Sequence, residues 1–424
     1  MIQLLKGHDR NIERNSILWN MVASLLYSFQ SAVLLLAVTR LAGLEMAGMF
    51  SIAYAVSQMF SSIGSFAMRE YQASDTNRKY SFDKYMTFRV CSILIMLIMC
   101  IGYSAICGYS GQKLVAILLF LGYRVTDVAE DVLHGELQRS GRLDIGARIM
   151  SARIAVSSVG FLLALYISKN LVVAAAAMLA IAMACLLVLN GAVLADMHYS
   201  FRWDTKGVLH MFLEVLPVCV GAFIYNYLNN SPKYAIDSVL TDDVQAIFNI
   251  VYMPVFVTTM LAQFIFKPYV AELGEKWNAD GHTGFYGLSI KLVGAIIAAG
   301  MVVLLGGFLL GVPVLDFVFG VDLREYKPLF MLLLLFGIVV ALDQFGTMLL
   351  TVMRRQQFVL VAYAISLVLD LMFMNSIVEK FNLWGAGLVY GLVVSSILVI
   401  YIIVILARGG QHEKRGADSY TGIQ

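Results

Sequence analysis

Long apolar stretches separated by short polar connections run through the whole chain. A helix needs about 20 mostly apolar residues to cross the hydrocarbon core of a bilayer. The pattern therefore predicts an all-α, polytopic membrane protein with about 12 transmembrane helices. The expected spans are 16–39, 45–68, 85–109, 113–138, 145–168, 170–195, 208–232, 244–266, 285–311, 328–352, 356–378 and 383–407.

The composition agrees with this pattern. The chain is 60% hydrophobic and 14% charged, with a mean hydropathy of +0.80, whereas soluble domains are roughly 45–50% apolar and 25% charged. A formal net charge of +2 gives no basic field for nucleic acid, so no nucleic-acid partner is expected. The five cysteines lie within apolar runs without metal-ligand spacing, so they are interpreted as buried hydrophobes and no metal site is expected.

The distribution of Lys and Arg indicates the orientation. With the N-terminus inside, nineteen Lys and Arg residues fall on cytoplasmic connections and seven on outer connections. Because cytoplasmic loops carry the excess of positive charge, both termini are expected in the cytoplasm. The polar first sixteen residues lead into an apolar segment too long for a signal-peptide core, so no cleavage is expected.

A hydrophilic connection, ADMHYSFRWDTKG at 195–207, divides the spans into two sets of six. The sequence therefore predicts an N-terminal six-helix lobe at 1–200 and a C-terminal six-helix lobe with a short cytoplasmic tail at 201–424. Such an arrangement is typical of transporters built from internal repeats.

The fourth span is unusually charged, with the sequence GYRVTDVAEDVLHGELQRSGR at 122–142. Helical spacing places Arg124, Asp127, Asp131 and His134 on one side, and a charged face at membrane depth must meet protein or water. One interpretation is a salt-bridge cluster that braces spans four and five, with arginines of the fifth span as partners: Arg142, Arg148 and Arg153. The other is a site where a carboxylate carries a proton or cation and the arginines face an anionic substrate. Both can hold together.

Polar side chains recur at helical spacing on the first two spans of each half. These stripes either bond helices to one another, as Ser, Thr and Asn do in membranes, or line a shared water-filled cavity, which their recurrence in both halves favours. The stripes are Asn20, Ser24, Tyr27 and Ser31; Ser51, Tyr54, Gln58, Ser61 and Ser65; Asn226, Asn229, Asn230, Lys233 and Asp237; and Asn249, Tyr252, Thr259 and Gln263.

No motif of soluble enzymes is present: the chain lacks a GxxxxGKS/T phosphate loop, an HExxH zinc motif and a GxSxG nucleophile motif. We therefore expect no enzyme, no catalytic residue and no cofactor, with coupling to H⁺ or Na⁺ as the ionic requirement to consider.

Several segments resemble one family in the order in which they occur. TRLAGLEMAGMFSIAYAVSQMFSSIGSFAMRE (39–70), the charged window with QRSGRLDIGARIMSARI after it, and YNYLNNSPKYAIDSVLTDDVQAIFNIVYMP (225–254) are similar to polysaccharide repeat-unit flippases. So are FVFGVDLREYKPLFMLLLLFGIVVALDQFGTMLLTVMRRQQ (317–357) and FNLWGAGLVYGL (381–392). These flippases serve O-antigen and capsule synthesis and belong to the multidrug/oligosaccharidyl-lipid/polysaccharide exporter superfamily.

The resemblance implies two six-helix lobes around a central cavity that opens alternately to each side of the bacterial cytoplasmic (inner) membrane. It implies a polyprenyl-diphosphate-linked oligosaccharide as substrate, moved to the outer leaflet for O-antigen, lipopolysaccharide or capsule. A polysaccharide polymerase and chain-length machinery would be partners. One departure is Lys233, which stands where Arg is more usual in the family and lacks the bidentate fork of Arg.

Candidate residues follow from this expectation. The basic candidates for the diphosphate are Arg40, Arg69, Arg124, Arg148, Lys233 and Lys291, and the amide candidates for the sugar are Asn20, Gln58, Asn226, Asn229 and Asn249. Candidates for ion coupling are Asp127, Asp131, Asp343 and Asp370.

Plainer interpretations stay open for single residues. Lys291 can snorkel to the membrane surface, Arg69 can anchor a span, and Arg40 can contact lipid headgroups. Lys233 can pair with Asp237, and Asp370 can contact Asn375 or another helix.

Two other functions compete. A drug or cation exporter of the same superfamily should have an acidic, aromatic cavity with few bases. A membrane polysaccharide polymerase or ligase should carry a large outer loop with catalytic side chains, but the outer connections here are short. The net charge around the cavity separates the first alternative from the flippase.

Overall fold

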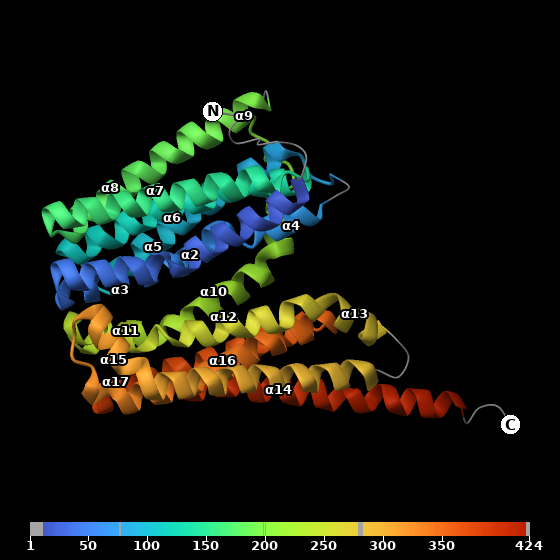
Figure 1. Cartoon of the computed structure of the whole chain (residues 1–424). Helices are drawn as coiled ribbons and strands as arrows, with labels where there is room; N and C mark the ends of the chain where they lie inside the picture. Colours follow the sequence, from blue (N-terminus) through green and yellow to red (C-terminus); the bar gives the residue numbers. More distant parts are fainter. Residues whose placement is uncertain (1–11, 76–77, 198, 200, 279–282, 421–424) are drawn as a thin grey trace. The chain divides into compact units, whose positions relative to one another are not determined.

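A computed structural model of the chain describes residues 12–75, 78–197, 199, 201–278 and 283–420. These residues form helices joined by short turns, and no strand occurs among them (Figure 1). The predicted all-α fold is confirmed. The polar residues 1–11, on which the expectation of an uncleaved N-terminus depends, lie outside the described ranges.

The helices form two compact units, one ending at Tyr227 and the other starting at Leu228. The first unit contains α2 (Ile12–Ala42), α3 (Leu44–Ser65), α4 (Met68–Ser74), α5 (Phe82–Ile106), α6 (Gly111–Arg139), α7 (Leu143–Ser168), α8 (Leu171–Cys185), the π-helix η2 (Leu186–Asn190) and α9 (Gly191–Asp196). The boundary between the units falls inside α10 (Val208–Val239).

The second unit continues with α11 (Asp242–Tyr252), α12 (Val255–Phe266), η3 (Lys267–Tyr269), α13 (Val270–Asn278), α14 (Thr283–Gly306), η4 (Gly307–Gly311), α15 (Val312–Phe319), η5 (Arg324–Tyr326), α16 (Lys327–Val352) and α17 (Gln356–Tyr420). The predicted lobes, 1–200 and 201–424, remain a proposal.

Each of the twelve predicted spans is helical over most of its length, although the second and third run past the ends of α3 and α5 and the eighth is interrupted between α11 and α12. Among the described residues, nine helices are long and apolar enough to cross a membrane. One of them, α17, is two helices that meet at Asn382, where the backbone leaves the helical region. The two remaining spans are α3 and α6, which carry too many polar side chains to stand among the nine. Both are largely buried within the first unit, so neighbouring helices cover their polar groups.

Glycines let helices of the first unit approach closely. A Cβ at Gly64 on α3 would lie 2.6 Å from Met96 of α5 and 3.0 Å from Val128 of α6, and a Cβ at Gly160 on α7 would lie 2.0 Å from Ile181 of α8. Larger side chains at these positions would separate the helices. Dense packing of this kind is what stabilises helix association in lipid, where no hydrophobic effect acts between helices.

The first part of α10 belongs to the core of the first unit. Val208, Met211 and Val215 on α10 share a buried cluster with Phe66 and Phe88. The C-terminal part of the same helix belongs to the second unit. One continuous helix therefore contributes to both cores.

The connection that leads into α10 is fixed on α5. The Tyr199 hydroxyl donates to Asp83 Oδ1 at 2.6 Å, the Arg202 amide donates to the same oxygen at 3.1 Å, and the Asp204 amide donates to Thr87 Oγ1 at 3.1 Å. Burial and the hydrogen bond to Asp83 raise the pKa of the Tyr199 hydroxyl above its usual range. The most hydrophilic connection of the chain is thus bound to the first unit by its backbone as well as by side chains.

Asn382 generates a stability prediction, because its φ of 51° and ψ of −134° suit glycine. Asn382→Gly should relieve backbone strain of about 1 kcal/mol and raise the apparent melting temperature in detergent by roughly 1–2 °C. The matched control is Asn375→Gly in the first half of α17, an exposed helical position, where glycine should lower stability. A lower melting temperature for Asn382→Gly would contradict the assignment of strain to this residue.

Candidate functional site

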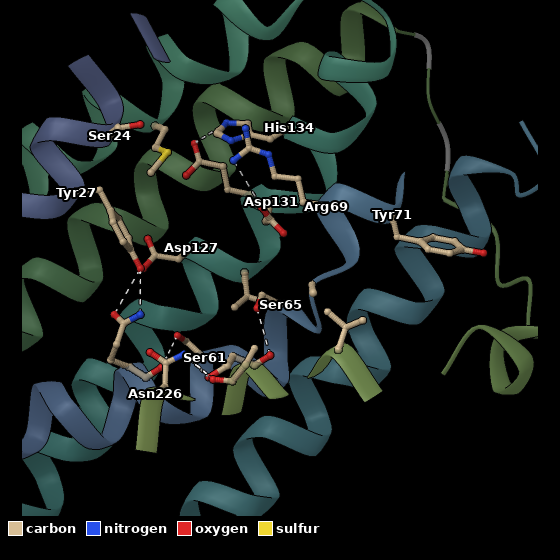
Figure 2. A pocket seen from close by; sticks show the side chains of 18 of the residues that line it. Ser24, Tyr27, Ser61, Ser65, Arg69, Tyr71, Asp127, Asp131, His134 and Asn226 are labelled. Carbon is tan, nitrogen blue, oxygen red and sulfur yellow. Dashed lines mark hydrogen bonds and ion pairs between the residues drawn. The ribbon is translucent and has the colours of Figure 1, made fainter. Parts of the chain in front are cut away.

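The first unit contains a pocket of about 840 Å³ (Figure 2). Its walls come from α2, α3, α4, α6, α7 and the first part of α10. Pockets that hold small ligands span roughly 300–1,000 Å³, so this volume suffices for a ligand larger than one sugar ring. The lining residues separate into an uncharged polar side and a charged side.

The uncharged side is formed mainly by the stripes of α2 and α3. Gln58 Nε2 donates to the Tyr27 hydroxyl at 3.2 Å, and Asn226 Nδ2 donates to Ser62 Oγ at 3.3 Å. Ser61 Oγ donates to the carbonyl of Gln58 at 2.7 Å, which leaves its lone pairs as acceptors. The stripe side chains both bond neighbouring helices and face the pocket, so the two interpretations of the stripes hold together in this unit.

The charged side is organised by Arg153 of α7. Its Nη2 lies 2.6 Å from Asp127 Oδ1, and its Nε donates to Glu130 Oε2 at 2.5 Å. Arg124 Nη1 donates to the other oxygen of Asp127 at 2.6 Å. The predicted salt-bridge cluster between the fourth and fifth spans is confirmed, with Arg153 as the partner from the fifth.

Arg142 and Arg148 have a different neighbour. Arg142 Nε lies 3.1 Å from Asp144 Oδ1, and Arg148 Nη2 lies 3.9 Å from Asp144 Oδ2. Asp144 stands in the first turn of α7. The sequence suggested acids of the fourth span as partners of these two arginines, whereas the ion pairs shown here are with Asp144 of the fifth span.

Asp131 is held by two arginines from other helices. Arg89 Nη2 of α5 donates to Asp131 Oδ2 at 2.8 Å, and Arg69 Nη1 of α4 lies 3.9 Å from Asp131 Oδ1. Arg89 also donates from Nη1 to the carbonyls of Gly64 and Ser65 at the end of α3. Sequence reasoning gave Arg89 no function, although an arginine within an apolar span signals a buried partner.

The arginines of this cluster differ in exposure. The side chain of Arg69 is 27% exposed, whereas those of Arg89, Arg124 and Arg153 are at most 2% exposed. Arg69 also makes the longest ion pair and lines the pocket (Figure 2). Its guanidinium is therefore the one of these four that is placed to receive an anion.

The charges of the cluster do not sum to a negative value. Four arginines stand against three carboxylates and leave one formal positive charge before His134 is counted; the members are Arg69, Arg89, Arg124, Arg153, Asp127, Glu130 and Asp131.

Arg124 lies beneath the pocket wall and is not among the lining residues. Its guanidinium carbon is 4.5 Å from the ring centre of Tyr54, 5.7 Å from that of Tyr27 and 5.6 Å from that of Tyr123. Only 1% of the side chain is exposed. The aromatic rings and Asp127 enclose this cation, so it supports the wall from behind.

The pocket brings together five of the predicted site residues: Gln58, Arg69, Asp127, Asp131 and Asn226. Besides Arg124, three others of the first unit lie outside the pocket lining. Asn20 is half-buried on α2, Arg40 is exposed at the end of α2, and Arg148 is half-buried on α7 with its guanidinium carbon 5.6 Å from the ring centre of Trp19.

In the second unit, Lys233 Nζ lies 5.5 Å from the ring centre of Tyr252. The Tyr252 hydroxyl donates to the Asn229 carbonyl at 3.1 Å and lies 2.8 Å from the Tyr390 hydroxyl, from which it can accept. Asn249 is half-buried on α11, one turn before Tyr252. These residues of α10, α11 and α17 form one polar contact region within the second unit.

The remaining candidates of the second unit differ in burial. Lys291 is exposed on α14, which agrees with snorkelling. Asp343 on α16 is 4% exposed, and its Oδ1 has no hydrogen-bond partner among the described residues. Asp370 on α17 is fully buried and accepts a hydrogen bond from Ser231 Oγ of α10 at 2.6 Å, so its expected contact with another helix is confirmed.

No model of a known protein family matches the sequence, and no curated protein matches it. Solved structures do match the fold. A MATE transporter in a bent conformation is 16% identical with a TM-score of 0.55, over 98% of this chain and 99% of the other. An inward-facing multidrug resistance MATE family transporter of the MOP superfamily is 15% identical with a TM-score of 0.55, over 96% of both chains.

The lipid II flippase MurJ, in an inward closed conformation, also matches. It is 10% identical with a TM-score of 0.69, over 91% of this chain and 87% of the other. The protein therefore has the fold of these multi-pass membrane transporters, and its many membrane-spanning helices agree with that fold.

The cluster predicts different outcomes for two arginines. Arg124→Ala should leave a cavity and remove one of the two partners of Asp127, whose side chain is 14% exposed, at a cost of about 3 kcal/mol or more. The yield of folded protein should fall severalfold, measured by fluorescence-detected size-exclusion chromatography of membrane extracts. Arg69→Ala should preserve the yield, because Arg69 is partly exposed and its ion pair is long.

Lys291→Ala is the control for this comparison, because Lys291 is an exposed cation. A normal yield for Arg124→Ala, equal to that of the Lys291 variant, would contradict the supporting function assigned to Arg124.

Proposed function

We propose that the protein is a flippase that moves polyprenyl-diphosphate-linked oligosaccharide repeat units across the bacterial cytoplasmic membrane for cell-surface polysaccharide synthesis. The observation that carries the proposal is the two-sided pocket of the first unit, where an uncharged polar wall adjoins a charged wall that exposes Arg69. The transporter fold, shared with a lipid II flippase among others, supports the same class of function.

The chemistry of such a substrate matches the two sides of the pocket. Its sugar head and diphosphate cannot enter hydrocarbon, whereas its polyprenyl tail is soluble in lipid. Hydroxyl and amide groups such as those of Tyr27, Gln58 and Asn226 would bond sugar hydroxyls. Arg69 would bind the diphosphate through charge-assisted hydrogen bonds. The protein needs to shelter the head alone while the tail stays in the bilayer.

A drug or cation exporter is the second candidate, because multidrug transporters share the fold. An exporter of cations should offer carboxylates to the ligand. In this pocket every carboxylate of the charged side already lies against an arginine. The lining residues bear two arginines and three carboxylates, and the buried Arg89 and Arg124 behind them bring the whole cluster to one formal positive charge. This balance favours an anionic ligand.

A polymerase or ligase is disfavoured, because the structures that match the fold are transporters. We propose a function without a catalytic residue or cofactor. Movement would follow alternating access, with both termini in the cytoplasm. A polysaccharide polymerase and chain-length machinery would act on the delivered substrate.

Coupling to H⁺ or Na⁺ would require an acid that is not committed to an arginine. Asp127 and Asp131 hold arginines in place, so we assign them to the pocket wall. Asp343 and Asp370 lie buried in the second unit, outside that ion-pair network, and are the better candidates for coupling.

Deletion of the gene in its native host tests the function. Lipid-linked repeat units should accumulate on the inner leaflet, and surface polysaccharide should disappear. Wild-type protein should restore the polysaccharide and Arg69→Ala should not, whereas Arg69→Lys should restore part of it, because Lys keeps the charge but loses the bidentate fork. Electrophoresis of surface polysaccharide and leaflet-resolved labelling of the glycolipid are the measurements.

The matched control is Lys291→Ala, which should restore polysaccharide fully. Normal polysaccharide in the deletion strain, together with increased sensitivity to cationic drugs, would contradict the flippase function and support the drug exporter.

A further inference from the structure

We propose that Glu130 and His134 form a proton-binding site in the wall of the pocket, and that protonation of this pair strengthens the binding of an anionic head at Arg69. The second part of the inference rests on the proposed function, and the first part does not. Neither residue was assigned a function from the sequence.

The two side chains face one another on α6. They are four residues apart, and His134 Nε2 lies 3.5 Å from Glu130 Oε1. Both residues line the pocket, and they are only 3% and 1% exposed. Within the described part of the chain, neither of these two atoms has a hydrogen-bond partner. A buried acceptor and an imidazole nitrogen that face each other without a hydrogen bond are costly unless a proton is shared between them.

The contacts of Arg153 explain why Glu130 Oε1 has no hydrogen-bond donor among the described residues. Its Nε binds Glu130 Oε2, and its Nη2 is directed to Asp127 Oδ1. Glu130 Oε1 is therefore turned toward His134. Protonation of His134 from pocket water would give an imidazolium whose Nε2–H donates to Oε1, which turns an unsatisfied contact into an ion pair.

The imidazole ring is held in place by α7. A Cβ at Gly146 would lie 2.7 Å from His134 Cδ2, so only glycine allows this close approach. The ring therefore cannot move far from Glu130 toward α7, and its orientation is maintained in both protonation states. His134 points into the pocket beside the side chains of Asp131 and Arg69 (Figure 2).

Charged and titratable groups of the neighbouring helices interact with His134, with Glu130, or with the partners of this pair. They are Glu130 and Asp131 on α6, Arg69 on α4, Arg89 on α5, Arg153 on α7 and the Cys185 thiol at the end of α8.

The aspartates of the pocket are poor proton carriers by comparison. Asp127 lies 2.6 Å from each of two guanidinium groups, and Asp131 lies 2.8 Å from Arg89. Both carboxylates are therefore committed to guanidinium partners. Histidine ordinarily changes charge between pH 5 and 8, and His134 is the imidazole among the lining residues of this pocket.

A proton on His134 raises the formal charge of the cluster from one to two positive charges. An anion at Arg69 would be bound more tightly, and by linkage the bound anion would stabilise the protonated imidazole to the same degree. Because the site is buried, the coupling is expected to reach about tenfold in affinity, equivalent to one unit of pH.

The experiment uses the full-length protein in nanodiscs with farnesyl diphosphate as the probe. Its dissociation constant is measured at pH 5.5 and 8.0 by microscale thermophoresis. The affinity of the wild type should rise about tenfold more at low pH than that of His134→Gln. The probe's own titration is common to both proteins and cancels. His210→Gln is the matched control, because His210 is exposed on α10 outside the pocket, and it should behave as the wild type.

Hydrogen–deuterium exchange at the imidazole C2 position of His134, followed by mass spectrometry, tests the proton site without any ligand. Glu130→Gln should shift the pH midpoint of this exchange, because the amide removes the negative partner of the imidazole. An unchanged midpoint would overturn the proton site. His134→Gln binding with the pH dependence of the wild type would overturn the linkage.

Failure of every protein to bind the probe at both pH values would overturn the proposed anion binding and the linkage with it. The midpoint shift caused by Glu130→Gln would still support the proton site.

Discussion

The contact of Arg153 with Asp127 and Glu130 is the interaction on which the pocket depends. A charged side chain at membrane depth must meet an opposite charge or water, and this guanidinium satisfies two carboxylates of α6 from α7. It thereby determines which carboxylate oxygens of α6 can contact a further partner. Asp127 has one oxygen for Arg124, and Glu130 has one oxygen for His134. The distribution of these few bonds decides which groups face the pocket and which support it.

The same constraint explains the difference between the arginines. Arg124 and Arg89 are enclosed by aromatic rings, carboxylates or backbone carbonyls, so their charges are used within the protein. Arg69 lies in the short helix α4, at the end of a span, and its ion pair within the described part of the chain is with a distant oxygen of Asp131. A cation that is partly compensated and partly exposed can exchange its partner for a ligand at low cost, whereas a fully enclosed one cannot.

Each span predicted from the sequence falls on helical residues of the structure, because twenty-residue apolar segments leave few alternatives to a helix in a membrane. The sequence also predicted that the charges of the fourth span would be internal. The pairings themselves could not be predicted in full. Arg89 reaches Asp131 from a helix 42 positions away, and the position of the His134 ring depends on the glycine of α7 against it. Such contacts depend on how closely two helices pack, and the spacing of residues along one helix does not predict that packing.

The continuity of α10 across both units determines where the chain can be cut into two fragments. The first turns of this helix complete the core of the first unit through Val208, Met211 and Val215, and its later residues belong to the second. A chain cut at the polar connection before this helix would give an N-terminal fragment that lacks one wall of its own pocket. Coexpressed fragments should therefore be separated at the turn after Val239, where a gap in the backbone interrupts neither helix.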